Sequence, residues 1–153
     1  MPNFGSGWTQ TNTASTTVPM NDLIGTAAIS GAIYEINSGS AATADNAVSY
    51  GIVRTTSDGT SSANKAGNDV GMGAATAACT NSTAWNINPT ITSATAYLLF
   101  WGQHQRGTYR WVAYDYTKML RTGCGASTFK GLAMLAVAVS SAFVASFSIE
   151  WEE

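Results

Sequence analysis

The sequence predicts an all-β protein built as a β-sandwich, in which two sheets pack face to face. Apolar and polar residues alternate in several segments, which is the period-two pattern of a half-buried strand. Turn signals separate these segments, and no long stretch carries the 3.6-residue period of a capped amphipathic helix. A chain of 153 residues is long enough for one domain with a sizeable core.

Residues 1–22 are expected to form an extended N-terminal arm, followed by a β-sandwich domain over residues 23–153. The first 21 residues carry no charged side chain and are rich in Thr, Ser and Asn. Such a segment offers little apolar area to offset the entropy of ordering it. Phe4, Trp8 and Met20 are the anchors through which an arm would order against a neighbouring molecule. A frayed terminus or an edge strand of the domain itself is the alternative.

Two strands are expected early in the domain, over residues 27–36 and 47–55. The small polar residues 37–40 between them are typical of a turn. Asp58-Gly59 and Gly67-Asn68 then mark the two ends of a polar loop.

Two further strands are expected over residues 94–101 and 108–114. The first is apolar on both faces, which suits a central strand buried on both sides, and the second alternates. The polar segment 102–107, which begins and ends with glycine, is expected to be a hairpin loop.

The C-terminal segment is long, apolar and uncharged from Gly131 to Ile149, so it could be mistaken for a membrane span. Its last part alternates, however, which predicts a strand, and no membrane partner is expected. The residues on its apolar face are Phe143, Ala145, Phe147, Ile149 and Trp151. Seven or eight strands of this kind favour a jelly-roll-like sandwich, with the strand order left open.

The most unusual property of the composition is its low charge. Only 10% of the residues are Asp, Glu, Lys or Arg, against roughly 25% in an ordinary domain. Because surface charge keeps a free protein dispersed, a chain with so little is expected to be largely covered by partners. A modest excess of basic groups over residues 101–130 contains no Lys/Arg run and suits solvated charges, so no nucleic-acid partner is expected.

The sequence predicts no enzyme, cofactor or metal site. His104 is the one histidine, and no nucleophile-elbow context accompanies it. A small hydrolase that depends on His104 is the least favoured interpretation. Cys79 and Cys124 have no metal-ligand spacing and are expected to be free thiols, although the sequence does not establish whether they meet in space.

The chain resembles the small β-sandwich head-decoration (cement) proteins of tailed bacteriophages. The likeness lies in the neutral composition, in the N-terminal arm, in the segment Phe100-Trp101-Gly102-Gln103-His104-Gln105-Arg106-Gly107-Thr108-Tyr109-Arg110-Trp111, and in the closing strand Phe147-Ser148-Ile149-Glu150-Trp151-Glu152-Glu153. It implies a jelly-roll-like homodimer or homotrimer, made in the host cytoplasm and bound to the exterior of the capsid. There it would contact the major capsid protein and bridge neighbouring subunits.

We expect partner contacts at Phe4, Trp8, His104, Gln105 and Arg106. A second hypothesis from another class is a carbohydrate-binding β-sandwich module of a phage tail or surface appendage. It predicts an exposed pair of tryptophans and glycan binding by a monomer. Other structural positions in a virion, such as the tail tube or the head–tail connector, also fit the composition.

Overall fold

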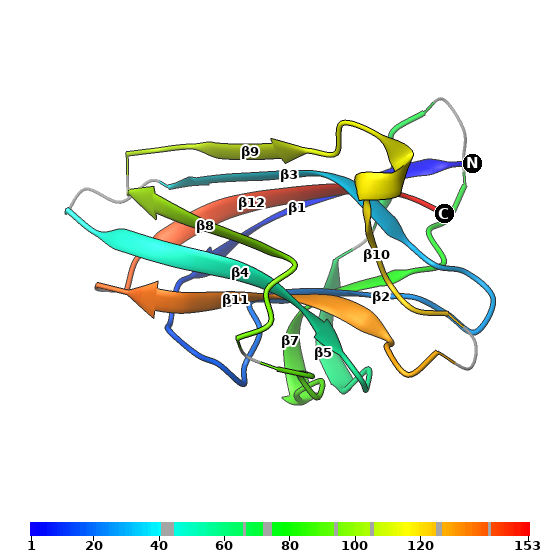
Figure 1. Ribbon diagram of the computed structural model, residues 1–153, viewed down its shortest axis with the longest axis horizontal. Coiled ribbons are helices and arrows are strands. Elements are labelled where there is room, and N and C mark those ends of the chain that lie inside the picture. The colour runs from blue at the N-terminus through cyan, green and yellow to red at the C-terminus, as the bar shows by residue number, and fades with distance from the viewer. Residues whose placement is uncertain are drawn as a thin grey trace.

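The computed structural model describes residues 1–40, 45–65, 67–71, 75–93, 95–104, 106–124, 127–140 and 142–153. These residues form two antiparallel six-stranded sheets and one short 3₁₀ helix, η1 (Tyr116–Lys118) (Figure 1). The strands are β1 (Asn3–Thr11), β2 (Asn21–Ile24), β3 (Ala32–Ser40), β4 (Ala47–Thr55), β5 (Thr60–Lys65), β6 (Asn68–Asp69), β7 (Thr80–Ile87), β8 (Leu99–His104), β9 (Tyr109–Val112), β10 (Leu120–Arg121), β11 (Gly131–Val139) and β12 (Val144–Glu152).

The strand order is that of a jelly roll. The first part of the chain pairs antiparallel with the last part, β1 with β12, β2 with β11, β3 with β9 and β4 with β8, like a long hairpin. Two more pairings, β3 with β12 and β4 with β11, roll this hairpin into two sheets. Sheet A therefore runs β9-β3-β12-β1, and sheet B runs β8-β4-β11-β2. The prediction of a β-sandwich with jelly-roll character is confirmed.

The remaining strands extend this framework at its margins. In sheet A, β6 pairs with β1 and β10 pairs with the start of β3. In sheet B, β7 pairs with β2 and β5 with β7, and Figure 1 shows these two strands projecting below the main body. The ends of β3, β8 and β11 and the starts of β4, β9 and β12 lie at one end of the molecule, opposite the two termini (Figure 1).

The core lies between the two sheets and is rich in aromatic side chains. The alternation expected in the C-terminal strand is confirmed, because Ala145, Phe147, Ile149 and Trp151 of β12 are all buried. Tyr50 of β4 meets Phe147 edge to face, with ring centroids 5.3 Å apart. Such aromatic contacts add specific geometry to the hydrophobic burial that holds the sheets together.

The N-terminal segment is a strand of the sandwich, which corrects the expectation of a separate arm over residues 1–22. β1 pairs with β12 along its whole length and with β6 on its other edge. Phe4 is fully buried against Trp151, and Trp8, which is 6% exposed, stacks on Phe147. The boundary expected between residues 22 and 23 falls inside β2. In β1, Phe4 and Trp8 alternate with glycine and threonine, so both aromatic side chains lie on the buried face of the strand. The average composition of the segment does not reveal this pattern.

The strand expected over residues 94–101 also needs correction. Within the described ranges this part of the chain forms β8 only from Leu99, and β8 is the edge strand of sheet B. Phe100 is 52% exposed, so the strand is not buried on both faces. The hairpin loop expected at 102–107 is shorter, because β8 continues to His104, and the strands it joins belong to different sheets. Ala94 lies outside the described residues.

Candidate functional site

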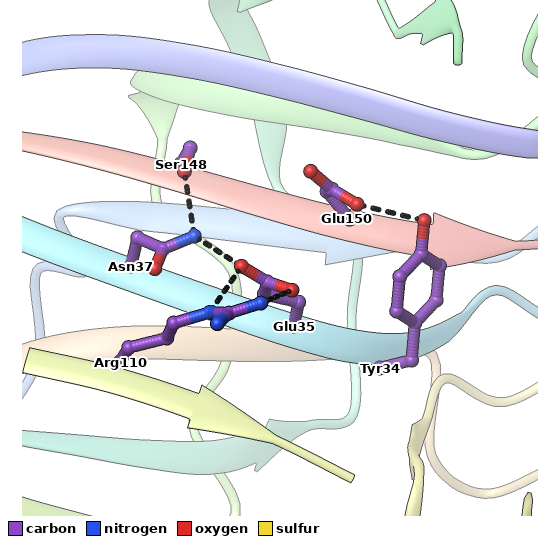
Figure 2. A network of polar contacts seen from close by, with 6 residues as sticks. All are labelled: Tyr34, Glu35, Asn37, Arg110, Ser148 and Glu150. Carbon is purple, nitrogen blue, oxygen red and sulfur yellow. Dashed lines mark hydrogen bonds and ion pairs between the residues drawn. The ribbon is translucent and has the colours of Figure 1, made fainter.

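The outer faces of the two sheets differ in how they are covered. Over sheet B, Ile91 and Tyr97 from the β7–β8 connection pack on Val53, Ala133 and Leu135. The outer face of sheet A carries a polar network across β9, β3 and β12 (Figure 2). The candidate site is therefore on sheet A.

A β-bulge in β3 shapes this network. Glu35 lies opposite Glu150 of β12, but the next pair along is Ile33 with Trp151, so Tyr34 is an extra residue in β3. An extra residue breaks the alternation of side chains, so two successive ones can point to the same face. Consequently both side chains lie on the outer face, where Tyr34 contacts Glu150 and Glu35 contacts Arg110, as Figure 2 shows.

Glu35 is the centre of the network. It accepts two hydrogen bonds from Arg110 of β9, from Nε to Oε1 at 2.8 Å and from Nη2 to Oε2 at 2.9 Å. It also accepts one from Asn37 Nδ2 at 2.8 Å, and the same amide lies 3.4 Å from Ser148 Oγ. Beside this group the Tyr34 hydroxyl donates to Glu150 Oε2 at 2.8 Å. The side chains of three neighbouring strands are thus connected.

The electrostatics of the network follow from these contacts. The hydrogen bond from Arg110, and then that from Asn37, hold the pKa of Glu35 below its usual value. The same pairing raises the pKa of Arg110, so both groups keep their charges at neutral pH. Burial, and then the hydrogen bond to Glu150, raise the pKa of Tyr34, which stays a neutral hydrogen-bond donor. The site therefore holds a balanced ion pair beside one further carboxylate.

A groove of about 480 Å³ adjoins the network on the same face. Its floor is β3 at Gly39, where an added β-carbon would lie only 3.1 Å from Ser146 Oγ. On one side it is bounded by Thr108 and Arg110 and on the other by β12. The complete lining is Asn37, Ser38, Gly39, Thr108, Tyr109, Arg110, Ser146, Phe147 and Ser148.

The turn beside the groove is held in place from inside the sandwich. Ser38 of β3 donates to Gln103 Oε1 at 2.5 Å, and Gln103 Nε2 donates to the Gly107 carbonyl at 2.8 Å. Gln103 is buried although it is polar, because both ends of its amide are hydrogen-bonded. It therefore links the β8–β9 connection to the floor of the groove.

A second surface is the side of the sandwich where β8 and β9 lie. Each is the last strand of its sheet along this side and pairs with one neighbour only, within the described residues. The two strands are adjacent in space, because Trp101 stacks on Tyr109 with centroids 4.7 Å apart. Four exposed apolar residues lie on these strands or within two residues of their ends, and we call this surface the β8–β9 side: Leu98, Phe100, Val112 and Tyr114.

The structure does not bring the five expected contact residues together. Phe4 and Trp8 are core residues of β1, which corrects their assignment as partner contacts, since neither can reach another molecule while the fold is intact. His104 and Arg106 are exposed at the β8–β9 turn, outside the groove lining. Gln105 lies outside the described residues.

Sequence reasoning did not single out the network residues. Their signal was present as polar positions alternating in two strands, but only strand pairing reveals that they meet. The residues concerned are Tyr34, Glu35, Asn37, Arg110, Ser148 and Glu150.

No family model, curated protein or solved structure matches this chain.

Among the described ranges no cluster of three or more His, Cys, Asp or Glu could hold a metal ion. No helix there is long and apolar enough to span a membrane. Cys79 and Cys124 are free thiols, the first buried and the second exposed. Burial, and then the neighbouring Glu153 carboxylate, raise the pKa of Cys79 to about 12, which makes it a poor nucleophile at neutral pH.

Proposed function

We propose that this chain is a structural protein of a tailed-phage virion, which binds the outer capsid surface and bridges neighbouring capsid subunits. The observation that carries the proposal is the β8–β9 side, which combines two edge strands with four exposed apolar residues on or beside them. Phe100 is 52% exposed and Tyr114 is 81% exposed. Interfaces are enriched in aromatic residues and depleted in Lys and Glu, and the β8–β9 side has this character.

Open strand edges give this surface a means of association. Along an edge, backbone N–H and C=O groups without a ladder partner can pair with a strand of another chain. Soluble proteins usually protect such edges with charge, but only 10% of this chain is charged. We therefore assign the β8–β9 side to contacts with a second copy and with the major capsid protein. Repetition over a symmetric shell would turn modest single contacts into strong collective binding.

The experiment compares the molar mass and the capsid binding of variants that differ at one exposed position. Phe100→Asp and Tyr114→Asp place a charge on the β8–β9 side, and Ile87→Asp is the matched control on β7. Ile87 is also a large exposed apolar residue of sheet B, but it lies at the other side of that sheet. Sedimentation velocity gives the molar mass, and co-sedimentation with undecorated capsids gives the binding.

The wild-type chain and Ile87→Asp should sediment as a discrete dimer or trimer and bind capsids. Phe100→Asp and Tyr114→Asp should shift toward monomer and bind at least tenfold more weakly, with unchanged circular dichroism. A wild-type chain that stays monomeric and does not bind capsids would overturn the proposal.

A further inference from the structure

We propose that the groove on the outer face of sheet A is a binding site for an uncharged oligosaccharide. This function goes beyond capsid attachment and uses the outer face of sheet A, next to the β8–β9 side. The groove volume of about 480 Å³ falls within the range of about 300–1,000 Å³ that is usual for small-molecule sites. Three features of the groove favour such a ligand: its shape, the hydrogen-bonding groups along it and the balance of its charges.

The shape comes from a row of small residues between two raised sides. β3 forms the floor and lies between β9 and β12, so the groove follows the direction of the strands. Gly39, Ser146 and Ser148 contribute little or no side chain above the backbone. Arg110 rises on the β9 side. This arrangement is an open trough suited to an extended chain of rings rather than a closed pocket for one compact ligand.

The hydrogen-bonding groups are both numerous and fixed in position. A guanidinium carries five N–H donors, of which Glu35 takes two, so the other three of Arg110 can serve a ligand. The Asn37 amide nitrogen donates to Glu35 and lies near Ser148, which leaves its carbonyl oxygen as an acceptor at the groove. Hydroxyls of Thr108 and Ser146 can both donate and accept. Such a mixture matches sugar hydroxyls, which also do both.

Glu35 does not line the groove, but it orients two side chains that do. It holds Arg110 of the neighbouring strand β9 through two hydrogen bonds, and Asn37 of its own strand β3 through one. Side chains ordered before binding lose less conformational entropy when a ligand arrives. Figure 2 shows these contacts of Glu35 with Arg110 and Asn37. Glu35 is therefore a positioning residue of the proposed site.

The charge balance selects an uncharged ligand. The Arg110 charge is already paired with Glu35, and Glu150 places a second carboxylate close by. A phosphate or a uronic acid would have to compete with Glu35 and would be repelled by Glu150. An apolar ligand would remove water from Arg110 and Asn37 without replacing their hydrogen bonds. A neutral polyhydroxylated chain avoids both costs.

The test is a glycan array that carries neutral and anionic oligosaccharides, probed with the full-length chain. Each hit is then measured by titration calorimetry. We expect hits among the neutral glycans, at micromolar to millimolar affinity. Ser146→Trp, which fills the groove from an exposed position of β12, should abolish binding. Arg110→Ala should weaken it at least tenfold.

Two further variants separate positioning from general damage. Glu35→Gln should weaken glycan binding severalfold and broaden the NMR signal of the Asn37 side-chain amide, because one member of the ion pair is lost. Lys118→Ala, which removes an exposed cation of η1 outside the groove, should leave affinity unchanged. Circular dichroism and thermal midpoints establish that each variant is folded.

The possible outcomes are decisive. Absence of any neutral hit, hits confined to anionic glycans, or binding that survives Ser146→Trp would each overturn the inference. Capsid binding provides an independent readout: Ser146→Trp should leave it intact, whereas Phe100→Asp should weaken it and leave glycan binding intact. Failure of one proposal is thereby distinguished from failure of the other.

Discussion

At the scale of single residues, the most unusual environment is that of Asp22. This carboxylate is fully buried in β2, where it accepts hydrogen bonds from the Ser82 backbone amide and from Trp85 Nε1, both at 3.2 Å. Burial raises the pKa of Asp22 to about 7, against the lowering effect of these bonds, and Asp58 adds a smaller repulsion. Asp22 therefore changes its charge near neutral pH.

This pKa predicts how stability depends on pH. In the unfolded chain Asp22 titrates near 3.8, so between pH 4 and 7 the folded state keeps a proton that the unfolded state releases. The stabilising contribution is complete below pH 3.8 and is lost as pH rises toward 7. Relative to Asp22→Asn, the wild-type free energy of unfolding should fall by up to about 1.4 kcal/mol per pH unit in this window.

Urea unfolding of both proteins at pH 4.5 and 7.5 measures this difference. Taking the difference cancels the contributions of Glu35 and Glu153 to the pH dependence. Their lowered pKa values make stability rise with pH, equally in both proteins. Parallel pH profiles for wild type and Asp22→Asn would show that Asp22 does not titrate in this window.

At the scale of elements, β1 has the greatest consequence for how the protein is interpreted. It lies between β12 and β6, and it buries Phe4 and Trp8. Replacing one large buried aromatic with alanine usually costs about 3–5 kcal/mol, and a whole domain is stable by only about 5–15 kcal/mol. β1 is thus required for the fold itself.

Deletion of residues 1–11 should therefore abolish cooperative unfolding. The missing strand exposes one edge of β12 and the aromatic core, so thermal unfolding followed by circular dichroism should show no transition. A shorter deletion, of residues 1–2, is the control, because it removes only the exposed Met1 and the Pro2 carbonyl that accepts from the Glu153 amide. An unchanged midpoint after the longer deletion would mean that β1 is a dispensable arm after all.

At the scale of the whole molecule, low charge and open edges act together. The chain has only seven basic and nine acidic side chains, and Arg110 is already paired with Glu35. Long-range electrostatic attraction is a weak candidate for driving assembly of such a molecule. Burial of apolar side chains and pairing of strand edges are the stronger candidates.

The oligomer should consequently be insensitive to salt. Because 0.5 M NaCl reduces the screening length to a few ångströms, it would weaken an assembly that depended on exposed ion pairs. We expect the same sedimentation coefficient at 0.05 and 0.5 M NaCl. Dissociation at the higher concentration would indicate that charged contacts hold the copies together.

Local patterns in the sequence were sufficient for much of the fold. The expected strand over 47–55 coincides with β4, and the alternation around Trp151 placed the buried face of β12 correctly. These predictions succeeded because side-chain period is a property of neighbouring residues. The prediction of an N-terminal arm was wrong for a related reason. The average composition of this segment is polar, but the positions of Phe4 and Trp8 on one face make it a strand of the sandwich.

The candidate site required information of another kind. Glu35, Arg110 and Ser148 lie on three strands that are distant in sequence. Tyr34 of β3 reaches Glu150 on the same face as Glu35 only because of the β-bulge. Strand order, register and bulges arise from long-range pairing, which no local pattern encodes. The amino-acid sequence therefore established an all-β, charge-poor chain with its main buried positions. Which strands are edges, which face is open and which polar groups meet came from the packing of the two sheets.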